Sequence, residues 1–162
     1  MTGQRYLLVL GGGFAAGTLD MLYACVFWGL RSDVPALRIF QSVAAGLLGE
    51  AAFEGGAATA ALGLGLHYFI ATSMSVTYYF VAGRWHLLQR RPLLCGAGYG
   101  LLLYAIMNYL VVPLSAAGTG SKNALWIGLS IAVHAVLIGI PIAILARKAH
   151  AVGTGPAILG SV

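Results

Sequence analysis

The sequence predicts an all-α integral membrane protein, a four-helix bundle with an additional short interfacial or re-entrant helix between the first and second spans. The chain of 162 residues is 60% hydrophobic and 8% charged, with a mean hydropathy of +0.90, whereas a soluble domain carries roughly 25% charged residues. Its apolar residues fall into four stretches long enough to cross a bilayer, for which about 20 residues suffice. The 23 glycines fit this class, because close helix contacts in lipid favour small residues.

The four predicted spans are separated by glycine, proline and charged residues. They cover residues 6–29, 57–83, 93–114 and 124–147, and with a short helix over 34–49 they form one transmembrane domain, residues 1–147, followed by a flexible tail, residues 148–162. In the last span Pro141 removes one backbone hydrogen bond and predicts a kink. A cleaved signal peptide is the competing interpretation of the first span, but Asp20 interrupts its apolar run and no A-x-A site follows.

The short helix is predicted from its flanking residues. Ser32 and Asp33 before Pro35 form a helix-start signal, and Gly49 is expected to end the helix. A segment of about 15 residues is too short to span a bilayer. We therefore expect it to lie at the interface or to dip into the membrane and return.

Basic residues gather on one side of the predicted bilayer. The side with both termini and the 84–91 loop carries six of the nine Lys and Arg residues, namely Arg5, Arg84, Arg90, Arg91, Arg147 and Lys148. The positive-inside rule therefore places both termini in the cytoplasm. The net charge of +5 does not indicate nucleic-acid binding, because no run of Arg and Lys with interleaved aromatic residues occurs. The expected partner is the lipid bilayer.

Each predicted span places one polar side chain between the bilayer centre and the outer face. Asp20, His67 and His134 lie about ten residues, or roughly 15 Å, from the outer helix ends, and Asn108 lies somewhat shallower. Glycine and alanine share their helix faces, and small residues mark helix contacts in membranes. We therefore expect the four side chains to point into the bundle and to form a polar intramembrane site.

These residues allow three interpretations. They can be interhelical hydrogen-bond partners, each bond worth about 1 kcal/mol. They can form a proton or small-solute pathway, with Asp20 as the carboxylate and His67 and His134 as proton carriers. Glu50 and Glu54 would then be its outer mouth, although solvated interfacial charges are the simpler interpretation of this pair. Finally, the two histidines can ligate one haem iron axially, as in bis-histidine membrane cytochromes.

The leading hypothesis is a small polytopic membrane protein with a proton or small-solute pathway. The alternative is a non-catalytic accessory or structural subunit, which docks on a larger membrane complex or a second copy through glycine-rich helix faces. No enzyme activity, metal or resident cofactor is predicted, because HExxH, HxxEH and paired carboxylates on the spans are all absent from the sequence.

Several segments resemble a known family. They are residues 17–20 (GTLD), 39–49 (IFQSVAAGLLG), 55–60 (GGAATA), 65–71 (GLHYFIA) and 107–109 (MNY). In these segments the chain resembles the YagU-like family of small bacterial inner-membrane proteins of unknown function, and the resemblance extends over residues 13–147. It implies four spans and a bacterial inner (cytoplasmic) membrane, and it implies no chemistry.

Overall fold

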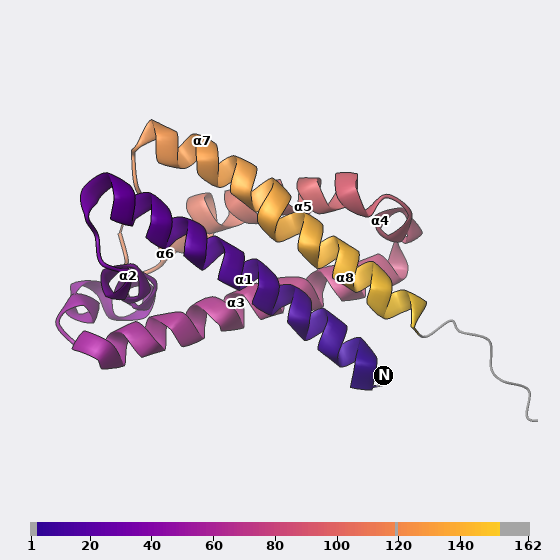
Figure 1. The fold of residues 1–162 in the computed structure, drawn as a ribbon, viewed down its shortest axis with the longest axis horizontal. Helices are drawn as coiled ribbons and strands as arrows, with labels where there is room; N and C mark the ends of the chain where they lie inside the picture. The colour runs from indigo at the N-terminus through magenta and orange to yellow at the C-terminus, as the bar shows by residue number, and fades with distance from the viewer. Residues whose placement is uncertain (1–2, 119, 153–162) are drawn as a thin grey trace, which may run out of the picture.

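The computed structural model describes residues 3–118 and 120–152, and within these ranges all regular structure is helical (Figure 1). The elements are α1 (Gly3–Ser32), α2 (Ala36–Leu48), η1 (Gly49–Phe53), α3 (Gly56–Arg84), α4 (His86–Arg90), α5 (Pro92–Ile106), η2 (Met107–Val111), α6 (Val112–Leu114), α7 (Ala124–Val133), η3 (His134–Gly139) and α8 (Ile140–Ala151). Here η1 is a 3-10 segment, and η2 and η3 are π-helical segments. The predicted all-α class is confirmed.

Five segments of the described chain are long and apolar enough to cross a membrane, one more than the sequence predicted. Four of them correspond to the predicted spans, namely Gly3–Ser32, Gly56–Arg84, Pro92–Leu114 and Ala124–Ala151. The fifth, Ala36–Phe53, is the predicted short helix lengthened by η1. Gly49 does end α2, with a φ of 60°, but the chain continues in a 3-10 turn to Phe53 instead of leaving the helix.

The helix ends differ from prediction in two places. Pro35 is the N-cap of α2 and no side chain caps this helix, so the expected capping by Ser32 or Asp33 does not occur. At the other terminus α8 continues to Ala151, one turn past the predicted start of the tail at residue 148, because apolar side chains there remain buried against the bundle. The rest of the predicted tail, residues 153–162, lies outside the described residues.

The long helical runs extend along the long axis of the molecule and alternate in direction (Figure 1). The N-terminus, α4 and the last turn of α8 therefore lie at one end, and α2, η1 and the connection between α6 and α7 lie at the other. In this view α2 is seen nearly end-on, so it runs across the long helices and not along them. α1 packs against α3 and α8, and α5 packs against η3 and α8.

Glycine allows α3 to approach two neighbours closely. A Cβ atom at Gly13 of α1 would lie 2.5 Å from Thr72 Cα of α3. A Cβ atom at Gly63 of α3 would collide with the Phe40 carbonyl oxygen of α2. The backbones are thus in direct contact at both crossings, as is usual for small residues at membrane helix interfaces.

A third close crossing joins α5 to η3. A Cβ atom at Gly100 would collide with the His134 carbonyl oxygen, and one at Gly139 would collide with the Gly96 carbonyl oxygen. Because each helix contributes glycine to the other's contact, neither can accept a side chain here without separation of the two backbones.

Each π-helical segment is followed closely by a proline. Pro113 follows η2, and Pro141 follows η3. In an α-helix the proline ring clashes with the carbonyl four residues earlier, which is Tyr109 or Leu137 here, and both lie inside the π-helical segments. The wider π turn relieves this clash. The distortion predicted at Pro141 is therefore a local change of helix type in the turn before it.

The buried core occupies the end of the molecule that holds α8's last turns. Tyr78 and Tyr79 of α3 and Ala146 and Ala149 of α8 are buried together. The His150 ring stacks on the Tyr79 ring (4.3 Å between centroids), and its Nε2–H donates to the Tyr79 carbonyl oxygen (3.1 Å). This end of the bundle is closed by close packing.

Candidate functional site

A cavity of about 340 Å³ lies between the first and second halves of the chain, toward the end that holds α2. α1, α2 and α3 line one side, and η2, α6, α7 and η3 line the other. Asp20, His67 and His134 all belong to its lining, and they come from α1, α3 and η3. The fold thus brings together three of the four polar residues that the sequence analysis selected.

His67 is held by the backbone of α1. Its Nε2 lies 2.8 Å from the Gly17 carbonyl oxygen, and because a carbonyl can only accept, Nε2 carries the proton. The neighbouring Tyr68 bonds to Thr18 Oγ1 (2.9 Å) and stacks on Phe14 (4.5 Å between centroids). These contacts hold the His67 ring in place. The His67 Nδ1 has no protein partner among the described residues.

His134 is held by its own helix. Its Nδ1–H donates to the Ser130 carbonyl oxygen (2.9 Å), one turn earlier, and the ring packs edge-on against Tyr104 (5.3 Å between centroids). The Ser130 hydroxyl in turn bonds to the Tyr23 hydroxyl of α1 (3.2 Å). A polar connection therefore crosses from α7 to α1 beside the cavity, and His134 Nε2 has no protein partner among the described residues.

Asp20 differs from the two histidines. Its side chain is half-buried, and among the described residues no donor or cation lies within bonding distance of its carboxylate. A carboxylate within a membrane protein is costly unless it has a partner or faces a water-filled cavity. Asp20 does line the cavity, so the solvent or a ligand in that cavity is what can satisfy it.

The cavity ends against the buried core on one side and against α2 on the other. Ile138 lines it and also belongs to the buried core, so the core forms its floor. Ser42 and Gly46 of α2 and Ser115 after α6 line the opposite end. There a backbone hydrogen bond from the Ala116 N–H to the Gly46 carbonyl oxygen (3.0 Å) joins α2 to the segment after α6.

Asn108 does not line the cavity. It lies in η2, where its Nδ2 donates to the Tyr104 carbonyl oxygen (3.0 Å), and Met107 and Val111 of the same segment face the cavity in its place. The prediction for Asn108 assumed regular α-helical spacing. The π-helical turn changes which side chains this helix presents, and Asn108 is not among the residues that the fold brings to the cavity.

Glu50 and Glu54 also lie away from the cavity. Both are exposed, at the start of η1 and directly after it, while Ala52 between them is fully buried. The short turn faces the protein with Ala52 and therefore turns both carboxylates outward. The α2 end of the cavity is lined by Ser42, Gly46 and Ser115 instead of these two acids.

Trp126 lines the cavity, and the sequence did not predict this. Its ring stacks on the Tyr23 ring (5.0 Å between centroids), and the Trp28 ring lies tilted beside it (5.3 Å between centroids). Tryptophan near a helix end is expected at the membrane interface, and that pattern gave no sign that Trp126 also faces inward. Ser130 did carry a signal, because it stands one helical turn before His134.

The two histidines differ in how they could ligate a haem iron axially. His67 Nε2 is already engaged by the Gly17 carbonyl, and ligation through it would break the bond that orients the ring, whereas His134 Nε2 has no protein partner among the described residues. Among residues 3–118 and 120–152, no three His, Cys, Asp or Glu side chains come together as ligands of a metal ion.

The part of the chain that the structure describes is thus a helical protein with five segments long and apolar enough to cross a membrane, and with a cavity on which Asp20, His67 and His134 meet. No family model, curated protein or solved structure matches the chain.

Proposed function

We propose that the chain is a small membrane protein whose cavity binds a proton or a small cationic or hydrogen-bonding solute at Asp20, as one step of a pathway across the membrane. The observation that carries this proposal is the meeting of Asp20, His67 and His134, from three different helices, on one cavity. Interhelical hydrogen bonding alone would not require a cavity at this place.

Asp20 is the proposed binding group. As a carboxylate without a protein partner it gains stability from a proton or a cation, because an unpaired charge within the membrane is costly. Binding and release at this side chain would therefore exchange charge with whatever enters the cavity.

The two histidines are the proposed proton carriers. Each ring has one nitrogen bonded to a backbone carbonyl and one without a protein partner. An imidazole in this state can accept a proton at the second nitrogen. His67 and His134 would thus pass protons to and from Asp20 through water in the cavity.

We further propose that α2 does not cross the membrane, so that the chain crosses four times. Its direction across the long helices supports this (Figure 1). The end with the N-terminus, α4 and the last turns of α8 holds the six basic residues named above. The positive-inside rule then places both termini in the cytoplasm, and the resemblance to the YagU-like family suggests the bacterial inner membrane.

Reporter fusions test this topology. Fusions after Trp85 and after His150 should both report a cytoplasmic location, and a fusion near Lys122 should report an external one. The physical reason is the excess of Arg and Lys at the first end. A crossing by α2 would invert the location of the first fusion relative to the N-terminus, so opposite signals at Trp85 and at the N-terminus would contradict four crossings.

Asp20→Asn tests the function. Asparagine keeps the shape and hydrogen-bonding capacity of the side chain and removes its titratable charge. In liposomes, we expect pH-driven flux through the variant to fall to the level of protein-free liposomes, while circular dichroism and size exclusion in detergent remain those of the wild type.

The matched control is Asp33→Asn, which removes the same charge from an exposed position after α1 and should leave the flux unchanged. Equal loss of flux in both variants would show that Asp20 has no special role. A wild-type protein with no flux at any pH would exclude the pathway and favour the accessory-subunit alternative.

A further inference from the structure

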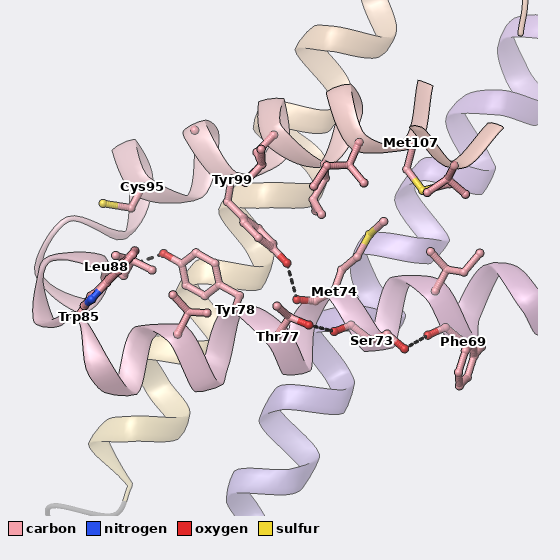
Figure 2. Close-up of a pocket in the computed structure, with 17 residues that line it drawn as sticks. Phe69, Ser73, Met74, Thr77, Tyr78, Trp85, Leu88, Cys95, Tyr99 and Met107 are labelled. Carbon is pink, nitrogen blue, oxygen red and sulfur yellow. Dashed lines mark hydrogen bonds between the residues drawn. The ribbon is translucent and has the colours of Figure 1, made fainter. Parts of the chain in front are cut away.

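A groove of about 650 Å³ lies between α3 and α5 and reaches α4 at one end (Figure 2). The two helices are bridged across it by side chains, as where the Tyr99 hydroxyl donates to the Met74 carbonyl oxygen (2.8 Å). The groove follows α3 from Phe69 to Trp85, a rise of about 24 Å at 1.5 Å per residue. One leaflet of the hydrocarbon core is about 15 Å deep, so the groove can hold an acyl chain along its length.

The hydroxyl groups on the walls of the groove are already hydrogen-bonded. Four hydroxyl groups line it, and each one donates to a backbone carbonyl (Figure 2). These bonds run from Ser73 to Phe69 (2.8 Å), from Thr77 to Ser73 (2.8 Å), from Tyr99 to Met74 (2.8 Å) and from Tyr78 to Leu88 (3.3 Å). An occupant therefore finds mainly apolar surface along the groove, and an apolar occupant matches it best.

Positive charge surrounds the α4 end of the groove. Arg84 ends α3, Arg90 ends α4 and Arg91 precedes α5, and all three are exposed. Trp85 lines the groove beside them and is 66% exposed, as expected for an aromatic side chain at headgroup depth. This end of the groove is thus suited to a negatively charged headgroup.

The chain has no acidic residue to neutralise these arginines. Its four acids are Asp20, in the middle of α1, and Asp33, Glu50 and Glu54, near the opposite end of the bundle. The counter-charge must therefore come from outside the chain. A second copy docked here would bring its own arginines to the same depth, and like charges would oppose the contact.

We infer that this groove binds one acyl chain of an anionic membrane phospholipid, with its phosphate near Arg84, Arg90 and Arg91. Basic pockets between transmembrane helices are a known way to hold such headgroups. The proposed lipid site does not include Asp20, His67 or His134. It does not depend on the orientation of the chain either, because both leaflets can contain anionic lipid.

Lipid retention by the purified full chain tests the inference. Native mass spectrometry would follow delipidated protein after incubation with phosphatidylglycerol or with phosphatidylcholine of the same acyl chains. We expect one phosphatidylglycerol to be retained at activation energies that remove phosphatidylcholine. The preference should weaken as salt is raised, because it depends on exposed charges.

Two kinds of variant separate the acyl site from the headgroup site. Gly98→Leu places a side chain in the groove, where a Cβ atom meets nothing within 4 Å, and should abolish retention of both lipids. Thr77→Phe, on the opposite wall of the groove, should also abolish retention of both lipids. It replaces Gly98→Leu in the experiment if that variant fails to fold. The pair Arg84→Gln and Arg90→Gln should lower phosphatidylglycerol retention about tenfold, to the level of phosphatidylcholine.

The controls carry the same changes elsewhere. Gly128→Leu fills an equally open position on α7, and Arg147→Gln with Lys148→Gln removes two exposed charges from α8 at the same end of the bundle. Both should retain phosphatidylglycerol normally. Equal retention of the two lipids by the wild type, or equal loss in the controls, would overturn the inference. A lipid-free dimer of the wild type that Gly98→Leu converts to a monomer would also overturn the inference, because it would assign the groove to a second copy of the chain.

Discussion

Gly100→Ala should separate α5 from η3 and lower the free energy of unfolding by about 3 kcal/mol or more, at or beyond the upper end of overpacking effects. The added methyl group would collide with the His134 carbonyl oxygen. Backbone atoms cannot rotate away as a side chain can, so the two helices must move apart along the whole contact. Thermal or denaturant unfolding of the purified protein in detergent measures the loss.

Gly98→Ala is the matched control for this prediction. It adds the same methyl group to the same helix two residues earlier, where a Cβ atom meets nothing within 4 Å. Helix propensity favours alanine over glycine by about 1 kcal/mol, so this variant should be as stable as the wild type or more so. Similar stability of the Gly100 and Gly98 variants would mean that the α5–η3 contact is looser than described.

Gly63→Ala should detach α2 from α3. Its methyl group would collide with the Phe40 carbonyl oxygen, and the displaced α2 would expose position 41, which is turned toward the start of α3 in the wild type (3.0 Å from Gln41 Nε2 to the Gly56 carbonyl oxygen). Gln41 is 1% exposed. A cysteine placed at position 41 should therefore react with a water-soluble maleimide slowly in the wild-type background and rapidly in the Gly63→Ala background.

Gly65→Ala controls for the glycine substitution itself, since a Cβ atom at that position is free of contacts within 4 Å. Labelling at position 41 should stay slow in this background. A cysteine at the exposed position 42 gives the upper limit of the labelling rate in all three backgrounds. Rapid labelling at position 41 without any change at Gly63 would show that α2 is not held as the structure places it.

The helices were largely predictable because their signal is local. Long apolar runs and Pro92 at the start of α5 are visible in the sequence. The cap of α7, where Asn123 Oδ1 accepts from the Trp126 N–H (3.1 Å), was not predicted. The π-helical segments were not predictable in the same way. Proline signals a distortion, but a helix can accommodate it by a bend or by a wider turn, and the sequence does not distinguish between the two.

The candidate site was predictable in part. Asp20, His67 and His134 could be selected because ionisable residues are rare in apolar runs and their depths matched. The hydrogen-bond partners and neighbours of these residues could not be predicted. That His67 bonds to Gly17, and that Trp126 faces the cavity, depends on how helices far apart in the sequence rotate about their axes, and a pattern along one helix does not contain that rotation.

The contacts between helices also determine how the molecule can bend. At the α8 end, α1, α3, α5 and α8 are joined in one packed core, whereas at the α2 end they diverge around the cavity. The contacts that hold the helices together are therefore concentrated at the α8 end. Any relative movement of the helices at the α2 end would carry α2 together with α3, because the two are in backbone contact at Gly63. Such a movement would also have to break the bond from the Ala116 N–H to the Gly46 carbonyl oxygen (3.0 Å), which joins α2 to the segment after α6.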